Sequence, residues 1–188
     1  MTTARLVRET RRAASLTQRE LAEHSGVTQS VIAAIESASQ DTRGAQLIRL
    51  LSASGYRLVA IPTTALSAAD WADIIYRELR QSEPNQDTAF RALIGLSDDL
   101  VAAAPPTRVA LCVTPPALCG DSRLDAALAG VVDYHLSRSR LPIPEWVRES
   151  TRVLKDEWVV SPYTDPDDTP PAIRRHGVRL AASELASV

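Results

Sequence analysis

Residues 16–37 read LTQRELAEHSGVTQSVIAAIES, and this stretch predicts two short helices joined by a tight turn. Thr17 and Glu20 have the spacing of a capping box, which satisfies backbone N–H groups at the start of a helix. Gly26 stands where the turn requires a positive φ, and Thr28 can cap the helix that follows. This order of cap, helix, turn and second helix predicts a helix-turn-helix.

The second of these helices, residues 29–37, has an apolar side formed by Val31, Ile32 and Ile35. Its other side carries small or amide-bearing side chains, which allow a helix to enter a DNA major groove closely. These candidate base-contacting residues are Gln29, Ser30, Ala33 and Ala34. The amide of Gln29 can bond N6 and N7 of adenine, and the alanines can touch thymine methyl groups.

The stretch resembles the helix-turn-helix of the XRE, or lambda-repressor-like, family. The residues that carry the resemblance are Leu16-Thr17-Gln18, Glu20-Leu21-Ala22, Gly26-Val27-Thr28-Gln29, Ile32, Ile35 and Glu36; a looser similarity extends from about Arg5 to Leu51. It implies a four-helix domain that binds double-stranded DNA sequence-specifically. We therefore assign residues 1–62 to a DNA-binding domain with further helices at 3–14 and 45–53.

Several polar residues around the two helices are expected to contact DNA phosphates, which position a protein without specifying sequence. They are Gln18, Thr28, Ser37, Ser39, Gln40 and Arg43. In the family, the glutamine that matches Gln18 also braces the one that matches Gln29.

Arg11 lies on the core-facing stripe of the first helix, where an unpaired charge would be costly. In the family, the residues that match Arg11 and Glu36 form an ion pair between the first and third helices, and we expect that pair here. The family often has glycine where this chain has Ala38, so the loop after the second helix of the motif is expected to differ slightly.

Residues 56–62, YRLVAIP, alternate in polarity, contain β-prone side chains and end at a proline, so they predict a short strand. A lone strand needs a hydrogen-bonding partner, either from the second half of the chain or from a second copy. The strand also resembles one in antitoxin-type XRE repressors, where it builds the dimer. We favour a homodimer through residues Tyr56, Leu58, Val59 and Ile61, which would bind a palindromic operator.

Residues 67–188 predict a second, mostly helical domain, so the expected fold class is mainly α. Helical patterns cover residues 67–81, 87–104 and 121–139, whereas 107–120 could be a short strand or an irregular connection. The tail shows shorter signals: a short helix after Leu141, another at 170–176 closed by Gly177, a strand-like run at 178–180, and a last helical turn.

The tail, from Pro144-Glu145-Trp146 to Gly177-Val178, is similar to C-terminal regions of helix-turn-helix proteins encoded beside nucleotidyltransferase-type toxins. That similarity implies an antitoxin that represses its own operon and binds the toxin through residues 67–188. One alternative is a ligand-sensing XRE regulator with a small-molecule pocket in residues 67–188. Another is an enzyme fused to a DNA-binding head.

Catalytic, metal and cofactor signals are weak, so we expect no enzyme, no metal and no cofactor. His24, His135 and His176 are scattered, and His176 with Arg174 and Arg175 predicts a solvated basic turn. Asp165, Asp167 and Asp168 lack the glycine and spacing of a calcium loop. Cys112 and Cys119 lack zinc-site spacing and predict free thiols.

The charge distribution agrees with one nucleic-acid-binding end. Residues 1–62 carry eight arginines and five acids, a net charge of +3, whereas 63–188 carry thirteen bases and eighteen acids, a net charge of −5. No run of eighteen apolar residues predicts a membrane span, and the N-terminus lacks a signal-peptide core. We expect a cytoplasmic protein.

Overall fold

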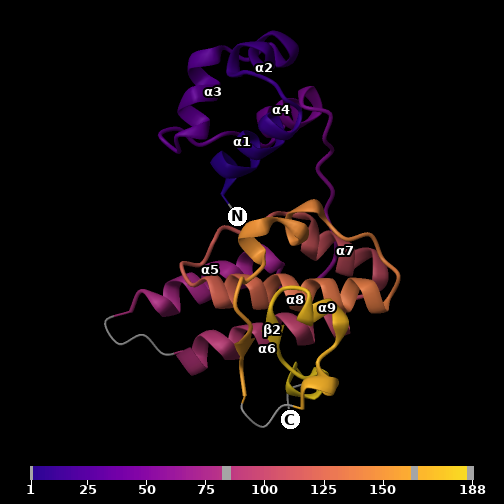
Figure 1. The fold of residues 1–188 in the computed structure, drawn as a ribbon. Coiled ribbons are helices and arrows are strands. Elements are labelled where there is room, and N and C mark those ends of the chain that lie inside the picture. The colour runs from indigo at the N-terminus through magenta and orange to yellow at the C-terminus, as the bar shows by residue number, and fades with distance from the viewer. Residues whose placement is uncertain (1, 82–85, 162–164, 186–188) are drawn as a thin grey trace. The chain divides into compact units, whose positions relative to one another are not determined.

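The structure is a computed structural model that describes residues 2–81, 86–161 and 165–185 (Figure 1). The chain forms two compact units, Met1–Ile61 and Pro62–Val188. Both are built mainly from helices, as the sequence predicts, and each has its own hydrophobic core.

The N-terminal unit contains four helices: α1 (Thr3–Ala13), α2 (Gln18–Ser25), α3 (Gln29–Glu36) and α4 (Gly44–Ala53). They enclose a core of branched aliphatic side chains, and every helix contributes to it. The buried members of this core are Val7, Leu21, Val27, Ile32, Ile35 and Leu50. Gly55 follows the end of α4 with a φ of 82°, a left-handed conformation that glycine adopts readily.

Residues 56–61 do not form a strand in the single chain, and the expected β-strand is therefore absent from the described secondary structure. A strand requires a partner to receive its backbone hydrogen bonds, and one copy of the chain does not supply it here. The segment instead exposes four large apolar side chains between 38% and 71%: Tyr56, Leu58, Val59 and Ile61.

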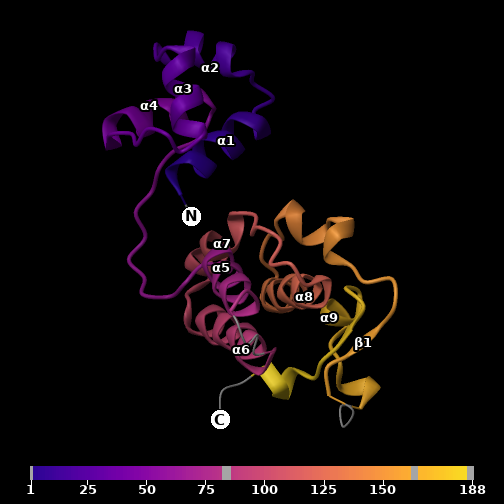
Figure 2. The ribbon, with the colours of Figure 1, turned by 90° about the vertical axis from the view of Figure 1, so that its left-hand side faces the viewer.

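The C-terminal unit begins with α5 (Ala68–Leu79), α6 (Gln86–Ala102), α7 (Pro105–Val113) and α8 (Ser122–Arg138). Ser67 and Asp70 form a capping box at the start of α5, with the Ser67 backbone N–H donating to Asp70. Helix α6 packs against both α5 and α8. The axes of the three helices lie roughly parallel, with α5 and α6 running in opposite directions, and Figure 2 views them close to end-on.

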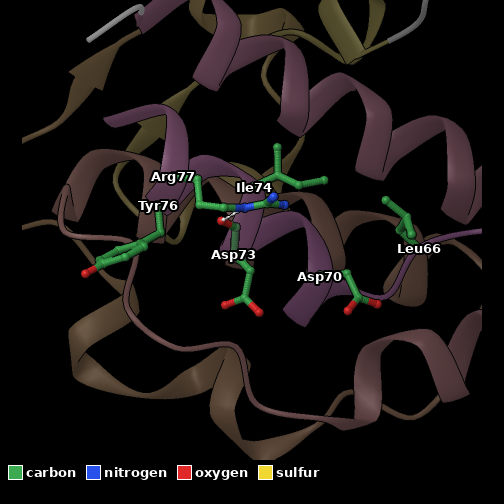
Figure 3. Close-up of a pocket in the computed structure, with 6 residues that line it drawn as sticks. All are labelled: Leu66, Asp70, Asp73, Ile74, Tyr76 and Arg77. Atoms are coloured by element: carbon green, nitrogen blue, oxygen red, sulfur yellow. Dashed lines mark hydrogen bonds between the residues drawn. The ribbon is translucent and has the colours of Figure 1, made fainter. Parts of the chain in front are cut away.

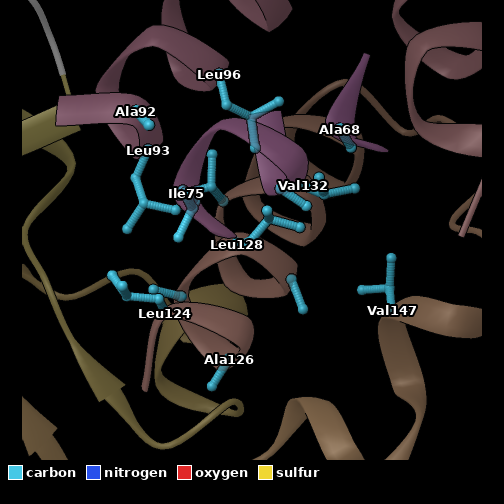
Figure 4. Packing of buried hydrophobic residues seen from close by; sticks show 14 of the residues in the cluster. Ala68, Ile75, Ala92, Leu93, Leu96, Leu124, Ala126, Leu128, Val132 and Val147 are labelled. Atoms are coloured by element: carbon cyan, nitrogen blue, oxygen red, sulfur yellow. The ribbon is translucent and has the colours of Figure 1, made fainter. Parts of the chain in front are cut away.

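Helix α8 is the centre of this unit, because most of its residues are buried, polar ones included. Figure 4 shows Leu124, Leu128 and Val132 of α8 packed among side chains of α5 and α6 such as Ile75 and Leu96. With few aromatic residues in the sequence, alanine, leucine and valine fill most of this core.

The interval 107–120 differs from both structures expected for it, since its first half belongs to helix α7. The preceding helix ends at Ala102, and Pro105 and Pro106 open the new helix instead of simply closing the old one. Proline is tolerated in the first turn of a helix because the N–H that it lacks would have no partner there. Short apolar runs such as VALCV do not distinguish strand from helix by periodicity.

The tail wraps α8 with short elements: η1 (Glu145–Arg148), η2 (Ser150–Arg152), β1 (Trp158–Val159), η3 (Pro166–Asp168), α9 (Pro171–Arg174), β2 (Val178–Arg179) and η4 (Ala182–Leu185). Strands β1 and β2 pair in parallel, with Trp158 beside Val178. Strand β2 agrees with the strand-like run expected at 178–180, whereas its partner β1 was not expected.

Candidate nucleic-acid interface

Local interactions define both ends of α2. The Thr17 hydroxyl accepts the Glu20 backbone N–H at 3.2 Å, and the Thr17 backbone N–H donates to the Glu20 carboxylate at 2.7 Å. The hydrogen bonds that the Glu20 carboxylate accepts from the Thr17 backbone N–H and hydroxyl lower the pKa of Glu20. At the other end of α2, Gly26 has a φ of 66° and donates its N–H to the Ala22 carbonyl. Any other residue at position 26 would be strained by that φ.

Helix α3 has a buried side and an accessible side. Ile32 and Ile35 are 0% and 1% exposed, which anchors the helix in the core. The four candidate base-contacting residues lie elsewhere: Gln29 and Ser30 are exposed, and Ala33 and Ala34 are half-buried. The start of α3 therefore presents an amide and a hydroxyl to solvent, followed by small side chains.

Arg11 and Glu36 form the ion pair implied by the sequence resemblance, with Arg11 Nε 2.7 Å from Glu36 Oε1 and Nη2 3.0 Å from Oε2. Gln18 Nε2 donates to Glu36 Oε2 at 3.0 Å, and Arg8 donates to the Glu36 carbonyl. Burial raises the pKa of Glu36, but the hydrogen bonds from Arg11 and Gln18 outweigh it, so the pKa is lowered. The same pair raises the pKa of Arg11.

The hydrogen-bond partner of Gln18 differs from the expected one. Its amide was expected to brace Gln29 and contact phosphate, but it donates to Glu36. In this structure Gln18 therefore adds a hydrogen bond to the ion pair that holds α3, and its contact with a DNA phosphate stays a prediction.

The loop after α3 carries the remaining polar candidates. Ser37, Ser39, Gln40 and Arg43 are all exposed, as is Thr28 at the start of α3. The hydroxyls of Ser37 and Ser39 both donate to the Ala34 carbonyl at 3.1 Å, which orders the end of α3. Between them Ala38 has a φ of 59°, so an alanine takes the left-handed conformation that glycine favours.

Comparison with protein families gives one result for this unit: residues 7–60 match the family described as Helix-turn-helix. The match covers all of α2, α3 and α4 and most of α1. Residues 7–60 are an XRE-type helix-turn-helix domain. The match supports a DNA-binding transcription regulator. Neither the curated proteins nor the solved structures contain a match to this chain.

Outside the helix-turn-helix domain, the structure corrects the prediction for His176, which is 2% exposed and not part of a solvated turn. Its Nδ1 lies 2.8 Å from the Arg152 carbonyl oxygen, and its Nε2 lies 3.3 Å from Asp133 Oδ2. Burial raises the pKa of Asp133, but hydrogen bonds from His176 and Ser137 and the charge of Arg175 lower it overall. The apolar residues around position 176 were the only sequence signal for this burial.

A second buried charged group, Arg152, was not identified from the sequence. Its Nη1 donates to Asp125 Oδ1 at 2.8 Å and its Nη2 donates to the Pro116 carbonyl, while its guanidinium lies over the Trp146 ring. Asp125 and Asp133 both belong to α8, so the buried Arg152 and His176 fasten the tail to that helix.

The other nucleophile and base candidates are also accounted for by packing. Ser97 and His135 lie 2.9 Å apart, but both are buried, and burial lowers the pKa of His135 to about 4. Cys112 and Cys119 are free and buried, as expected, and burial raises the pKa of each thiol to about 12. Thiols protonated at neutral pH are poor nucleophiles and poor metal ligands.

Among the described residues, no cluster of histidine, cysteine and acidic side chains has the arrangement of a metal site. In the same part of the chain, every helix is too short or too polar to cross a bilayer. A hollow on α5, shown in Figure 3, is lined by Leu66 and by residues of that one helix. Its Asp70 belongs to the capping box of α5, and its Arg77 donates to the Asp73 carbonyl.

We expect Glu36→Gln to destabilise the helix-turn-helix domain by about 3 kcal/mol, because it removes the buried charge of the pair and leaves the half-buried Arg11 without its counter-charge. The pH dependence of the domain's stability should change too. A lowered folded-state pKa gives stability that is present above the unfolded pKa of about 4.3 and is lost as pH falls through the folded-state value. Glu36→Gln should lack this acid-dependent loss, measured by hydrogen exchange of α1 and α3 peptides between pH 7 and 3.

The matched control is Glu23→Gln, which removes an exposed carboxylate that pairs with Arg19 four residues earlier. Exposed pairs of this kind contribute about 0.5 kcal/mol or less, so its exchange should match that of the wild type. Equal protection of α3 in Glu36→Gln and Glu23→Gln would show that the buried pair does not hold the helix.

Proposed function

We propose that the protein is a homodimeric, sequence-specific repressor that binds a palindromic operator through α3. One observation carries the proposal: the start of α3 exposes Gln29 and Ser30, while Ile32 and Ile35 hold its other side in the core. A helix anchored in this way can enter a major groove without rearranging the domain. The net charge of +3 over residues 1–62 favours approach to the phosphate backbone.

Each candidate residue then has a position-dependent role. Gln29 would bond an adenine edge, with Ser30, Ala33 and Ala34 following along the groove. Six polar residues would contact phosphates: Gln18, Thr28, Ser37, Ser39, Gln40 and Arg43. Gln18 would also help to position α3 through its hydrogen bond to Glu36.

Dimer formation is the second part of the proposal, and the exposed segment 56–61 supports it. Four of its six side chains are large, apolar and exposed, and its backbone lacks a strand partner within the described chain. Pairing with the same segment of a second copy would satisfy the backbone and bury those side chains. Two linked helix-turn-helix domains would bind one operator more tightly than a single domain.

The C-terminal unit is proposed to bind a protein partner, namely a toxin of the nucleotidyltransferase type whose operon this protein represses. Support for the partner comes from the similarity of the tail sequence and from the opposite charge of the two halves, since residues 63–188 carry a net charge of −5. The alternative, a ligand-sensing regulator, is favoured by a separate observation, a cavity in this unit at the starts of α6 and α8.

Gln29→Ala tests base recognition. It should weaken binding to the protein's own promoter fragment by about tenfold to a hundredfold, because one bidentate base contact contributes about 1–3 kcal/mol. Weak, salt-sensitive binding to scrambled DNA should be unchanged. Fluorescence anisotropy at two salt concentrations measures both, with Gln81→Ala on the C-terminal unit as the control. A variant that binds its promoter like the wild type would exclude Gln29 as the base-contacting residue.

Val59→Pro tests the dimer. Proline removes a backbone N–H and resists pairing inside a strand, so the variant should be monomeric in sedimentation velocity where the wild type is dimeric. Thr64→Pro, placed just beyond the segment, should leave the mass unchanged. If Val59→Pro keeps the dimer mass, the contact between copies lies elsewhere.

The partner is tested by coexpressing the full chain with the product of the adjacent gene. A toxin partner should arrest growth when expressed alone, and it should copurify with this protein at a fixed ratio and lose its toxicity. Gln29→Ala should retain this complex because the altered residue belongs to the DNA-binding edge. A neighbouring product that is harmless and elutes separately would refute the antitoxin role.

A further inference from the structure

A cavity of about 330 Å³ opens in the C-terminal unit between the starts of α6 and α8, strand β1 and η4. Its volume falls within the range of small-molecule sites. One lining residue, Asp121, caps α8. The other lining residues take no part in the helix caps described above, and none of the lining residues belongs to the DNA-binding proposal. Its lining side chains come from segments far apart in sequence, so the cavity exists only in the folded unit.

The walls of the cavity are apolar and partly aromatic. Phe90 of α6 and Trp158 of β1 contribute rings, and Leu124 and Val160 complete the hydrocarbon surface. Phe90 is the single phenylalanine of the chain, and Trp158 is one of three tryptophans. Neither ring is fully buried, so both retain a surface that a ligand could contact.

The polar residues of the cavity are predominantly acidic, with three carboxylates, Asp87, Asp121 and Glu184, against the one guanidinium of Arg123. Two of the carboxylates are held in place by backbone groups. Asp121 Oδ1 accepts the Arg123 backbone N–H at 2.8 Å, and Glu184 Oε2 accepts the Ala181 N–H at 2.8 Å. The acidic groups are therefore fixed at the edge of an aromatic surface.

We propose that this cavity binds a small organic cation, a guanidinium or alkylammonium compound with a short hydrocarbon body. The positive group would lie among the carboxylates and against the aromatic rings, where the charge and the ring faces both attract it. The hydrocarbon body would cover Leu124 and Val160 and remove their apolar surface from water. An anion would meet an excess of like charge in the lining, and a neutral compound would gain nothing from that excess of acidic groups.

Agmatine is a suitable test compound because it joins a guanidinium and an ammonium group through a four-carbon chain. Titrated calorimetrically into the full-length wild-type protein, it should bind saturably at one site, whereas N-butylurea, of similar shape but uncharged, should bind at least tenfold more weakly. Trp158→Leu and Glu184→Gln should each weaken agmatine binding by roughly fivefold. Asp73→Asn, in the hollow on α5, is the control and should bind like the wild type.

Several outcomes would overturn the proposal. Equal binding of agmatine and N-butylurea would show that charge is not recognised, and unchanged affinity in Trp158→Leu and Glu184→Gln would place the site elsewhere. Circular dichroism of both variants checks that the unit is folded, and Asp87→Asn provides a second acidic substitution if Glu184→Gln unfolds. An acetylated Gly-Arg-Gly amide that binds when agmatine does not would indicate a partner's side chain instead of a free cation.

This inference is independent of the operator-binding proposal. Gln29→Ala should bind agmatine with wild-type affinity even though its binding to the promoter fragment is weakened. Failure of the cation site would therefore leave the DNA-binding role intact, and failure of the DNA-binding role would leave the cation site intact.

Discussion

The buried carboxylate of Glu36 is the interaction on which the DNA-binding surface depends. It receives Arg11 from α1 and Gln18 from α2, and the Glu36 carbonyl receives Arg8. A charge that is 4% exposed is tolerated only with partners, so any shift of α3 that breaks these bonds is penalised. Helix α3 has eight residues and is about 12 Å long, so fixing its end and its apolar side also fixes the position of Gln29 at its start.

The C-terminal unit is also held together by buried pairs of charged and polar groups, although its tail has less regular secondary structure. The tail after α8 has short helical turns and a two-residue strand pair, which give little cooperative backbone hydrogen bonding. Arg152 and His176 compensate by placing polar groups against Asp125 and Asp133 of α8, about 12 Å apart along that helix. Leaving either aspartate without its partner would be costly, which favours one arrangement of the tail over other compact ones.

This difference explains how much of the structure the sequence predicted. The helix-turn-helix follows local rules, so the Thr17–Glu20 capping box, the positive φ of Gly26 and the apolar spacing of α3 were all visible in the sequence. The environment of His176 depends on Asp133, 43 residues away, and no local pattern indicates such a contact. Likewise, Pro105 can end one helix or begin the next, and the local sequence does not include the packing of α7 against α5 and α8.

In the candidate site, too, local sequence patterns predict some side-chain positions but not the contacts between helices. Exposure of Gln29 follows from helical periodicity, but the hydrogen bond of Gln18 depends on how α2 and α3 pack, and it differs from the brace that the family resemblance implied. The segment 56–61 is a harder case, because its pattern predicts a strand whose partner, on the dimer proposal, belongs to a second copy. A sequence pattern can indicate such a strand, but a single chain cannot display it.

The two units have separate hydrophobic cores, and this restricts how events in one could affect the other. Coupling between sites requires an element with two arrangements that both sites influence. The segment 56–61 joins the units and, on the dimer proposal, exists either paired with a second copy or unpaired. A partner or cation that binds the C-terminal unit could then change operator affinity by shifting the monomer–dimer equilibrium, without altering α3 itself. The position of Gln29 within each domain would stay constant, and the number of domains bound to one operator would change.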